Sequence, residues 1–213
     1  MRITVFGASG YSGGHITTEA LSRGIEVVGV ARDVAKVPAG ATAEAGDVTD
    51  AAFVSRAVDG AAVIVSALPT AAPSGDGTEL RTALENLVAA ARASGARLGV
   101  VGGAGSLLVA EGGPKLVDTP SFPDAVKPIA QEHDRALDYL RTVDDVDWFY
   151  VSPAASYGSF NPGEKRGTFR TSGDVLLTDA DGNSEISGAD YAIAFVDEVL
   201  TPAHERQRFS VAY

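Results

Sequence analysis

Residues 2–14 of the chain read RITVFGASGYSGG. The stretch begins with a short apolar run, which is typical of a buried parallel strand. Three glycines, Gly7, Gly10 and Gly13, then follow at intervals of three residues, and residues 15–23 have the apolar spacing of a helix. A strand, a glycine-rich turn and a helix in this order predict the first βα unit of a dinucleotide-binding fold.

Each glycine of this turn has a separate physical reason. Gly7 permits the tight turn at the end of the strand, Gly10 lets the backbone approach a pyrophosphate, and Gly13 lets the helix pack against the strand. The helix N-terminus offers unpaired N–H groups and a positive dipole to that anion, and Ser9 and Ser12 add hydroxyl donors. The alternative is an ordinary strand-to-helix turn that is rich in glycine.

Composition limits the possible functions. The chain has 213 residues, 45% of them hydrophobic, which suits a globular domain. It has no cysteine, so disulfides and thiolate metal sites are excluded, and its three scattered histidines predict no metal site. The net charge of −11 disfavours nucleic acid and anionic membranes as partners. A first strand at residue 2 leaves no room for a signal peptide, so we expect a cytoplasmic protein, a monomer or weak homodimer, that acts on a small molecule.

Apolar runs alternate with helical patterns along the chain, which indicates a mainly parallel sheet wound on both faces. Further strands are expected at residues 25–31, 41–46, 62–67, 97–101, 146–151 and 208–213. Further helices are expected at residues 51–58, 79–93, 129–141 and 187–200. The predicted fold class is therefore a Rossmann-like, doubly wound α/β sheet in one domain, residues 1–213. Right-handed crossovers place the strand carboxyl ends at one edge, where ligands bind.

The irregular segments give local expectations. Residues 68–78 form a loop rich in Pro, Gly and Ser, and Asp47 or Thr49 can cap the helix at 51–58. Residues 153–190 form a small lobe that covers the substrate. Within it, residues 168–171 and 174–178 could pair as a hairpin across Ser172 and Gly173.

The end of the second strand bears on the choice of cofactor. An acid there usually holds the ribose 2′-hydroxyl of NAD, whereas an arginine accommodates the 2′-phosphate of NADP. Arg32 comes first here and Asp33 follows. Because guanidinium forms paired, charge-assisted bonds with phosphate, the order favours NADP, with NAD as the alternative.

Six stretches together carry a resemblance to a known family: residues 5–13 (VFGASGYSG), 32–33 (RD), 46–50 (GDVTD), 101–106 (VGGAGS), 152–154 (SPA) and 186–192 (ISGADYA). The chain resembles the atypical short-chain dehydrogenase/reductases, specifically the NmrA-like NAD(P)H-binding group that includes NADH-flavin reductases and biliverdin reductase B. The resemblance covers essentially the whole chain.

The resemblance implies a set of cofactor contacts. The pyrophosphate would be held by Gly7, Ser9, Gly10, Tyr11 and Ser12, and the 2′-phosphate by Arg32. Asp47 and Val48 would flank the adenine, and Ala67 and Leu68 would pass the nicotinamide ribose. The residues near the nicotinamide ring would be Gly102, Gly103 and Pro153.

The sequence departs from most short-chain dehydrogenases in its acid–base residues. None of its six tyrosines has a lysine four residues later, so alcohol–ketone chemistry is disfavoured. Hydride transfer to a flavin or a similar conjugated acceptor needs mainly two flat rings held face to face. We therefore expect an NAD(P)H-dependent reductase for which flavin is a substrate and not a bound prosthetic group.

The candidates for the remaining chemistry each have a structural alternative. Ser106 follows the fifth strand at the crevice edge, but could be an ordinary loop serine or helix cap. His133 resembles a histidine near the substrate pocket of biliverdin reductase B, but could be a surface histidine between acids. Tyr157 and Phe160 could stack on a substrate or cover the core beneath their loop.

Two other functions stay open. The protein could bind dinucleotide as a redox sensor without turnover, as NmrA-like regulators do. It could instead be an epimerase with retained NAD, which the missing tyrosine–lysine pair argues against. A hydrolase is not expected, because no Gly-x-Ser-x-Gly elbow occurs.

Overall fold

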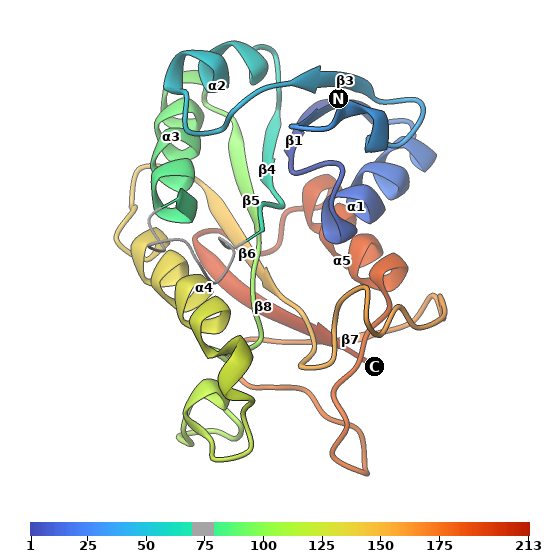
Figure 1. The fold of residues 1–213 in the computed structure, drawn as a ribbon, viewed down its shortest axis with the longest axis vertical. Helices are drawn as coiled ribbons and strands as arrows, with labels where there is room; N and C mark the ends of the chain where they lie inside the picture. The colour runs from blue at the N-terminus through green and yellow to red at the C-terminus, as the bar shows by residue number, and fades with distance from the viewer. Residues whose placement is uncertain (70–78) are drawn as a thin grey trace.

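The computed structural model describes residues 1–69 and 79–213, and its architecture is an eight-stranded sheet between two layers of helices (Figure 1). The strands are β1 (Arg2–Phe6), β2 (Glu26–Ala31), β3 (Thr42–Ala45), β4 (Val63–Ser66), β5 (Arg97–Val101), β6 (Trp148–Ser152), β7 (Arg170–Ser172) and β8 (Gln207–Ala212). They lie in the order β3-β2-β1-β4-β5-β6-β8-β7, and every pair is parallel except β7–β8. The predicted Rossmann-like, mainly parallel sheet is confirmed.

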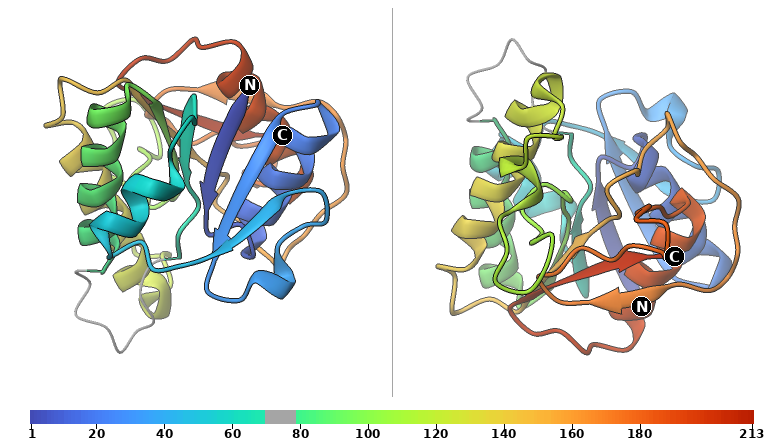
Figure 2. Two further views of the ribbon diagram at one scale, coloured as in Figure 1. Left: turned by 90° about the horizontal axis from the view of Figure 1, so that it is seen from above. Right: turned by 90° about the horizontal axis from the view of Figure 1, so that it is seen from below.

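The helices divide between the two faces of the sheet, as Figure 2 shows from above and below. They are α1 (Tyr11–Ser22), α2 (Ala51–Ala57), α3 (Glu79–Ser94), α4 (Lys127–Leu140) and α5 (Gly188–Leu200). One apolar cluster joins α1 and α5 to the sheet, and a second joins α2, α3 and α4 to the opposite face. Successive strand side chains alternate between these clusters, which explains why the central strands are mostly apolar.

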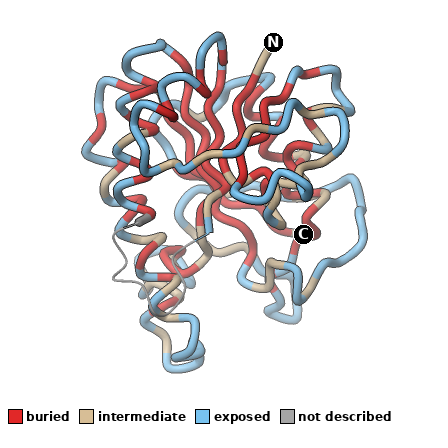
Figure 3. The backbone as a smooth tube through the Cα atoms, turned by 45° about the horizontal axis from the view of Figure 1, so that its top comes forward, coloured by how far each residue is buried: buried red, intermediate tan, exposed pale blue. Residues whose placement is uncertain are grey.

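Burial decreases from the centre of the sheet to its edges (Figure 3). The strands β4, β5 and β6 are buried at every residue, whereas β3 at one edge is mostly exposed. An exposed edge strand needs fewer apolar residues, so the sequence signal for β3 is weak. No helix in the described part of the chain is both long and apolar enough to cross a membrane.

The structure corrects two local predictions. Residues 168–178 do not form a hairpin, because β7 pairs antiparallel with β8 in the register Arg170↔Ala212. The cap of α2 is Asp50, whose carboxylate accepts hydrogen bonds from the amides of Ala52 and Phe53. Asp47 instead accepts from the amide and hydroxyl of Thr49. The predicted loop at 68–78 lies mostly outside the described residues.

The helices α1 and α5 pack closely at their N-terminal ends. A Cβ added to Gly188 would lie 2.3 Å from the His15 ring, so only glycine fits there. This approach lets the Tyr11 hydroxyl accept a hydrogen bond of 3.1 Å from the Gly188 amide. It thereby joins the turn after β1 to the segment that precedes α5.

Candidate dinucleotide-binding site

The turn between β1 and α1 requires glycine at two positions and leaves the third open. Gly7 has a φ of +86°, and a Cβ there would lie 2.3 Å from the Ala67 carbonyl oxygen. A Cβ on Gly13 would lie 2.1 Å from the carbonyl oxygen of Gly7. A Cβ on Gly10 would meet only that same oxygen, at 3.3 Å. Gly7 and Gly13 therefore shape the turn, whereas Gly10 leaves room above it.

A cleft of about 460 Å³ lies above this turn, at the carboxyl edge of the sheet. Its walls come from the ends of β1 and β2, the turn after β1, the loops after β3 and β4, and the start of α3. Predicted cofactor residues that line it are Gly7, Ser9, Gly10, Arg32, Asp47, Val48 and Leu68. The structure thus brings together residues from four separate loops, as expected for strand ends at one edge of a parallel sheet.

The start of α1 provides donors for an anion. Gly10 is the N-cap and has no side chain to bond the first turn. The amides of Tyr11, Ser12 and Gly13 have no acceptor within residues 1–69 and 79–213. Free amides and the positive end of a helix dipole form a site for phosphate.

The two charged residues after β2 have different surroundings. The Asp33 carboxylate accepts a hydrogen bond from the Ala35 amide and lies 3.4 Å from the Lys36 ammonium. The exposed Arg32 lines the cleft and makes no hydrogen bond or ion pair with any residue that the structure describes. Thr49 lowers the pKa of Asp47 through two hydrogen bonds, and the nearby charge of Arg32 contributes. Arg32 is therefore the group that remains available to a ligand.

The loop after β5 lies against two side chains, Tyr150 of β6 and His133 of α4. A Cβ on Gly102 would lie 2.0 Å from the Tyr150 ring, and one on Gly103 would lie 3.1 Å from the His133 side chain. The Tyr150 hydroxyl accepts from the Gly103 amide and donates to the His133 carbonyl, both at 3.1 Å. Burial lowers the pKa of His133 to about 4, so its imidazole is neutral at neutral pH. Pro153, after β6, is buried.

Ser106 is placed differently from the prediction. Its side chain is buried, and its Oγ accepts a hydrogen bond of 3.0 Å from the Arg208 guanidinium. Arg208 also pairs with Asp174, and so fastens the loop after β5 and the segment after β7 to β8. Ser106 does not line the cleft, and this contact supports its structural alternative over a catalytic role.

Tyr157 and Phe160 follow β6 but differ in exposure. The Tyr157 ring is half-buried, with its centroid 4.7 Å from that of Tyr191 and 5.4 Å from that of Tyr11. Its hydroxyl donates to the Ser12 Oγ at 2.8 Å. This placement fits the core-covering alternative for Tyr157. Phe160 is 77% exposed, and nothing in the described structure covers it.

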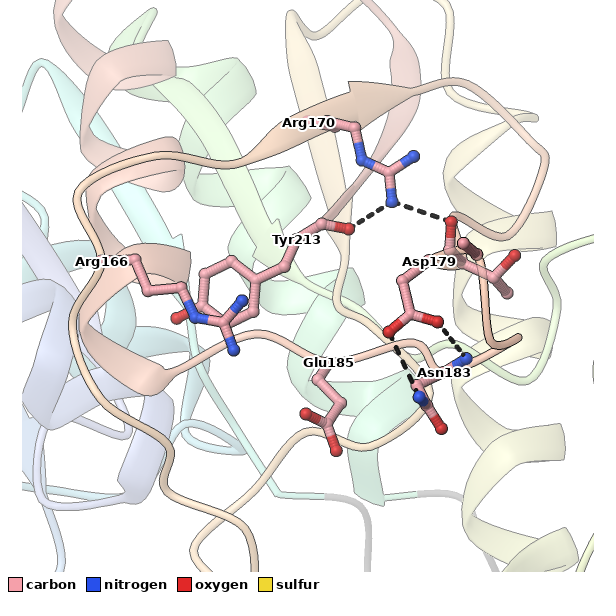
Figure 4. A pocket seen from close by; sticks show the side chains of 8 residues that line it. Arg166, Arg170, Asp179, Asn183, Glu185 and Tyr213 are labelled. Carbon is pink, nitrogen blue, oxygen red and sulfur yellow. Dashed lines mark hydrogen bonds between the residues drawn. The ribbon is translucent and has the colours of Figure 1, made fainter.

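A second cavity, of about 360 Å³, shares no lining residue with the cleft (Figure 4). Arg170 donates to the carbonyl oxygens of Thr178 and Tyr213, and Arg166 stacks on the Tyr213 ring, 3.6 Å from its centroid. Asp179 accepts from the backbone and side-chain amides of Asn183. Because these groups largely bond one another, the cleft above α1 is the better candidate site.

The parallel sheet, the glycine turn and the cleft at the carboxyl edge define a Rossmann-type dinucleotide-binding protein. A family model described as NAD(P)H-binding matches residues 7–202, and the chain belongs to this NAD(P)H-binding family. Its structural neighbours place it with the atypical, NmrA-like short-chain dehydrogenase/reductases. The predicted family resemblance is confirmed.

Three relatives show how far the similarity extends. The crystal structure of a "putative exported protein" from Burkholderia pseudomallei is 41% identical, with a TM-score of 0.87 and complete coverage of both chains. That of a "putative NADH-flavin reductase" from Streptococcus pneumoniae is 34% identical, with a TM-score of 0.86, and covers 100% of this chain and 99% of the other. YwnB of Bacillus subtilis is 36% identical over 99% of this chain and 98% of its own.

Proposed function

We propose that the protein is an NADPH-dependent reductase that passes hydride to a free flavin, a quinone or a similar small conjugated acceptor. The supporting observation is a cleft that brings together the free amides at the start of α1 and an Arg32 without an ion pair among the described residues, in a chain where no tyrosine has a lysine four residues later. The name of the Streptococcus pneumoniae neighbour is consistent with this chemistry.

The tyrosines and lysines argue against alcohol–ketone and epimerase chemistry. Burial raises the pKa of all six tyrosines above the ordinary value, so none is a tyrosinate at neutral pH. All four lysines pair with carboxylates: Lys36 with Asp33, Lys115 with Asp134, Lys127 with Asp124 and Lys165 with Glu19. The protein therefore has no lysine-activated tyrosine to take a proton from a substrate hydroxyl.

Reduction of a flavin or quinone makes smaller demands on the side chains. A nicotinamide held in the cleft would supply the hydride, and the reduced acceptor would spread its charge over conjugated rings, so that water could deliver the proton. The neutral His133 beside Gly103 can offer one hydrogen bond there but no positive charge. The main task of the chain is then to hold the cofactor and the acceptor in register.

Arg32 is the basis for preferring NADPH. Its guanidinium is unpaired within the described structure and opens on the cleft, whereas Asp33 is engaged with Ala35 and Lys36. Because Asp33 is held in that local turn, it does not compete to bind the ribose hydroxyls. An available guanidinium suits the 2′-phosphate that distinguishes NADPH from NADH.

The experiment follows NADPH and NADH oxidation at 340 nm with and without riboflavin or FMN. We expect flavin-dependent oxidation, and Arg32→Ala should lower kcat/KM for NADPH by about 10- to 100-fold, the value of a lost charged hydrogen bond, while NADH changes little. Arg135→Ala, which removes an exposed guanidinium on α4, is the matched control. An unchanged NADPH preference in Arg32→Ala would refute the assignment, and NADPH binding without turnover on flavins and quinones would favour the redox sensor.

A further inference from the structure

Two side chains separated by 145 residues meet at the start of α1. The Tyr157 hydroxyl donates to the Ser12 Oγ, at 2.8 Å. Ser12 is the second residue of α1, and its amide is one of the three without an acceptor in the described structure. Building on the proposed dinucleotide site, we propose that Tyr157 is a positioning residue for the cofactor diphosphate, because its bond to Ser12 leaves the Ser12 proton free to point at a phosphate oxygen.

The direction of the hydrogen bond follows from the available partners. The Tyr157 hydroxyl has Ser12 as its only hydrogen-bonding partner among the described residues, so its proton has no other protein acceptor. Burial raises the pKa of Tyr157, which keeps the phenol protonated. A hydroxyl carries one proton, so once Ser12 accepts from Tyr157 its own proton is available for a further acceptor.

The aromatic packing fixes the position of the phenol. The Tyr157 ring packs against Tyr191, which is fully buried, and against Tyr11, the first residue of α1. The Tyr11 hydroxyl in turn lies 3.4 Å from the Pro162 carbonyl oxygen and accepts from the Gly188 amide. The segment between β6 and α5 is thus tied to the first turn of α1, and a chain of hydrogen bonds ending on an anion gains strength from each link.

The test compares a ligand that contains the diphosphate with one that lacks it. Tyr157→Phe keeps the ring and removes only the hydroxyl. The bond that it removes joins two neutral hydroxyls. We therefore expect its Kd for NADPH to rise about 3- to 10-fold, the value of one neutral hydrogen bond, while the Kd for adenosine 2′-monophosphate stays unchanged. Ser12→Ala should weaken NADPH binding at least as much, and the double variant should be no weaker than Ser12→Ala alone, because both changes break one chain of bonds.

The control variant is Tyr213→Phe. It removes another half-buried tyrosine hydroxyl, which bonds to the Asp190 carboxylate in α5 and to the Glu164 carbonyl, and which accepts from the Ser187 amide just before α5. It should leave the NADPH Kd unchanged, because this hydroxyl does not contact Ser12. Equal losses in Tyr213→Phe and Tyr157→Phe would mean general loosening of the segment and would overturn the proposal.

Other results would also overturn it. These are an unchanged NADPH Kd in Tyr157→Phe or in Ser12→Ala, additive losses in the double variant, or an equal loss for adenosine 2′-monophosphate. The same measurements distinguish failure of the reductase proposal from failure of the proposed role of Tyr157. Wild-type protein that binds NADPH but reduces no acceptor would end that proposal and leave the role of Tyr157 standing, whereas wild-type protein that does not bind NADPH would end both.

Discussion

Gly10→Ala separates the phosphate-binding role of the turn from its structural role. The position has a φ of −81° and a ψ of 174°, which alanine adopts readily. The added Cβ would meet only the Gly7 carbonyl oxygen, at 3.3 Å, so that oxygen need move by only a few tenths of an ångström. The loss of flexibility in the unfolded chain offsets the poorer helix cap, and the free energy of unfolding should change by less than about 1 kcal/mol.

Nucleotide binding should respond much more strongly. Gly10 lines the cleft and is the N-cap of α1, so the methyl group would occupy space beside the first-turn amides of Tyr11 and Ser12, where we expect the phosphate to bind. Loss of one or two hydrogen bonds to a charged phosphate, each worth about 1.5–3 kcal/mol, should raise the Kd for NADPH by about 100-fold. Tryptophan and NADPH fluorescence titration at fixed ionic strength measures this change.

Gly14→Ala is the matched control. It adds the same methyl group one turn further along α1, where the nearest atom would be the Ala8 carbonyl oxygen at 3.7 Å. Alanine in the helix interior should raise the free energy of unfolding by about 0.5–1 kcal/mol and leave the NADPH Kd unchanged. Unchanged affinity in Gly10→Ala, or an equal loss in Gly14→Ala, would refute the argument that the turn holds a diphosphate.

The remaining predictions concern stability. Gly13→Ala should lower the free energy of unfolding by about 2–4 kcal/mol in urea denaturation, because its Cβ would lie 2.1 Å from the Gly7 carbonyl oxygen; wild-type stability would contradict the close packing. The pKa of His133 is about 4 in the folded chain and about 6.5 in the unfolded chain, because burial disfavours the charged imidazole. The contribution of the neutral, buried His133 to the free energy of unfolding is therefore complete above pH 6.5 and is lost as the pH falls towards 4. When the pH is lowered from 7 to 5, the free energy of unfolding should therefore fall by up to about 2 kcal/mol less in His133→Gln than in wild type. Equal falls in the two proteins would show that the imidazole is solvated.

The fold could be predicted from the sequence because local patterns decide most of it. Apolar runs that are buried on both faces predicted the central strands β4, β5 and β6, and the glycine turn predicted the first βα unit. The hairpin prediction was wrong because the sequence of β7 does not identify its partner. β7 uses the free edge of β8, with Arg170 opposite Ala212.

The cap of α2 shows a similar limit at short range. Asp47, Thr49 and Asp50 are all suitable capping types. Thr49 engages the Asp47 carboxylate, and Asp50 is left to bond the amides of the first turn. Such competition between neighbouring side chains is visible only once their geometry is known.

The parts of the candidate site that lie directly after one strand could be predicted from the sequence. The parts that depend on contacts between distant segments could not. The sequence identified the glycines and Arg32 because each follows directly from a βα unit. It gave no signal for the contact between Tyr157 and Ser12 or for the burial of Ser106 against Arg208, because both depend on how distant segments pack. The sequence therefore left Ser106 open between a catalytic residue and a loop serine, and its bond to Arg208 supports the second.

The most direct test of the central claim is a crystal structure of the protein soaked with NADP⁺. The account predicts the diphosphate within hydrogen-bonding distance of the amides of Tyr11 and Ser12, and the 2′-phosphate against Arg32. Dinucleotide bound elsewhere, or no bound dinucleotide at a saturating concentration, would contradict it.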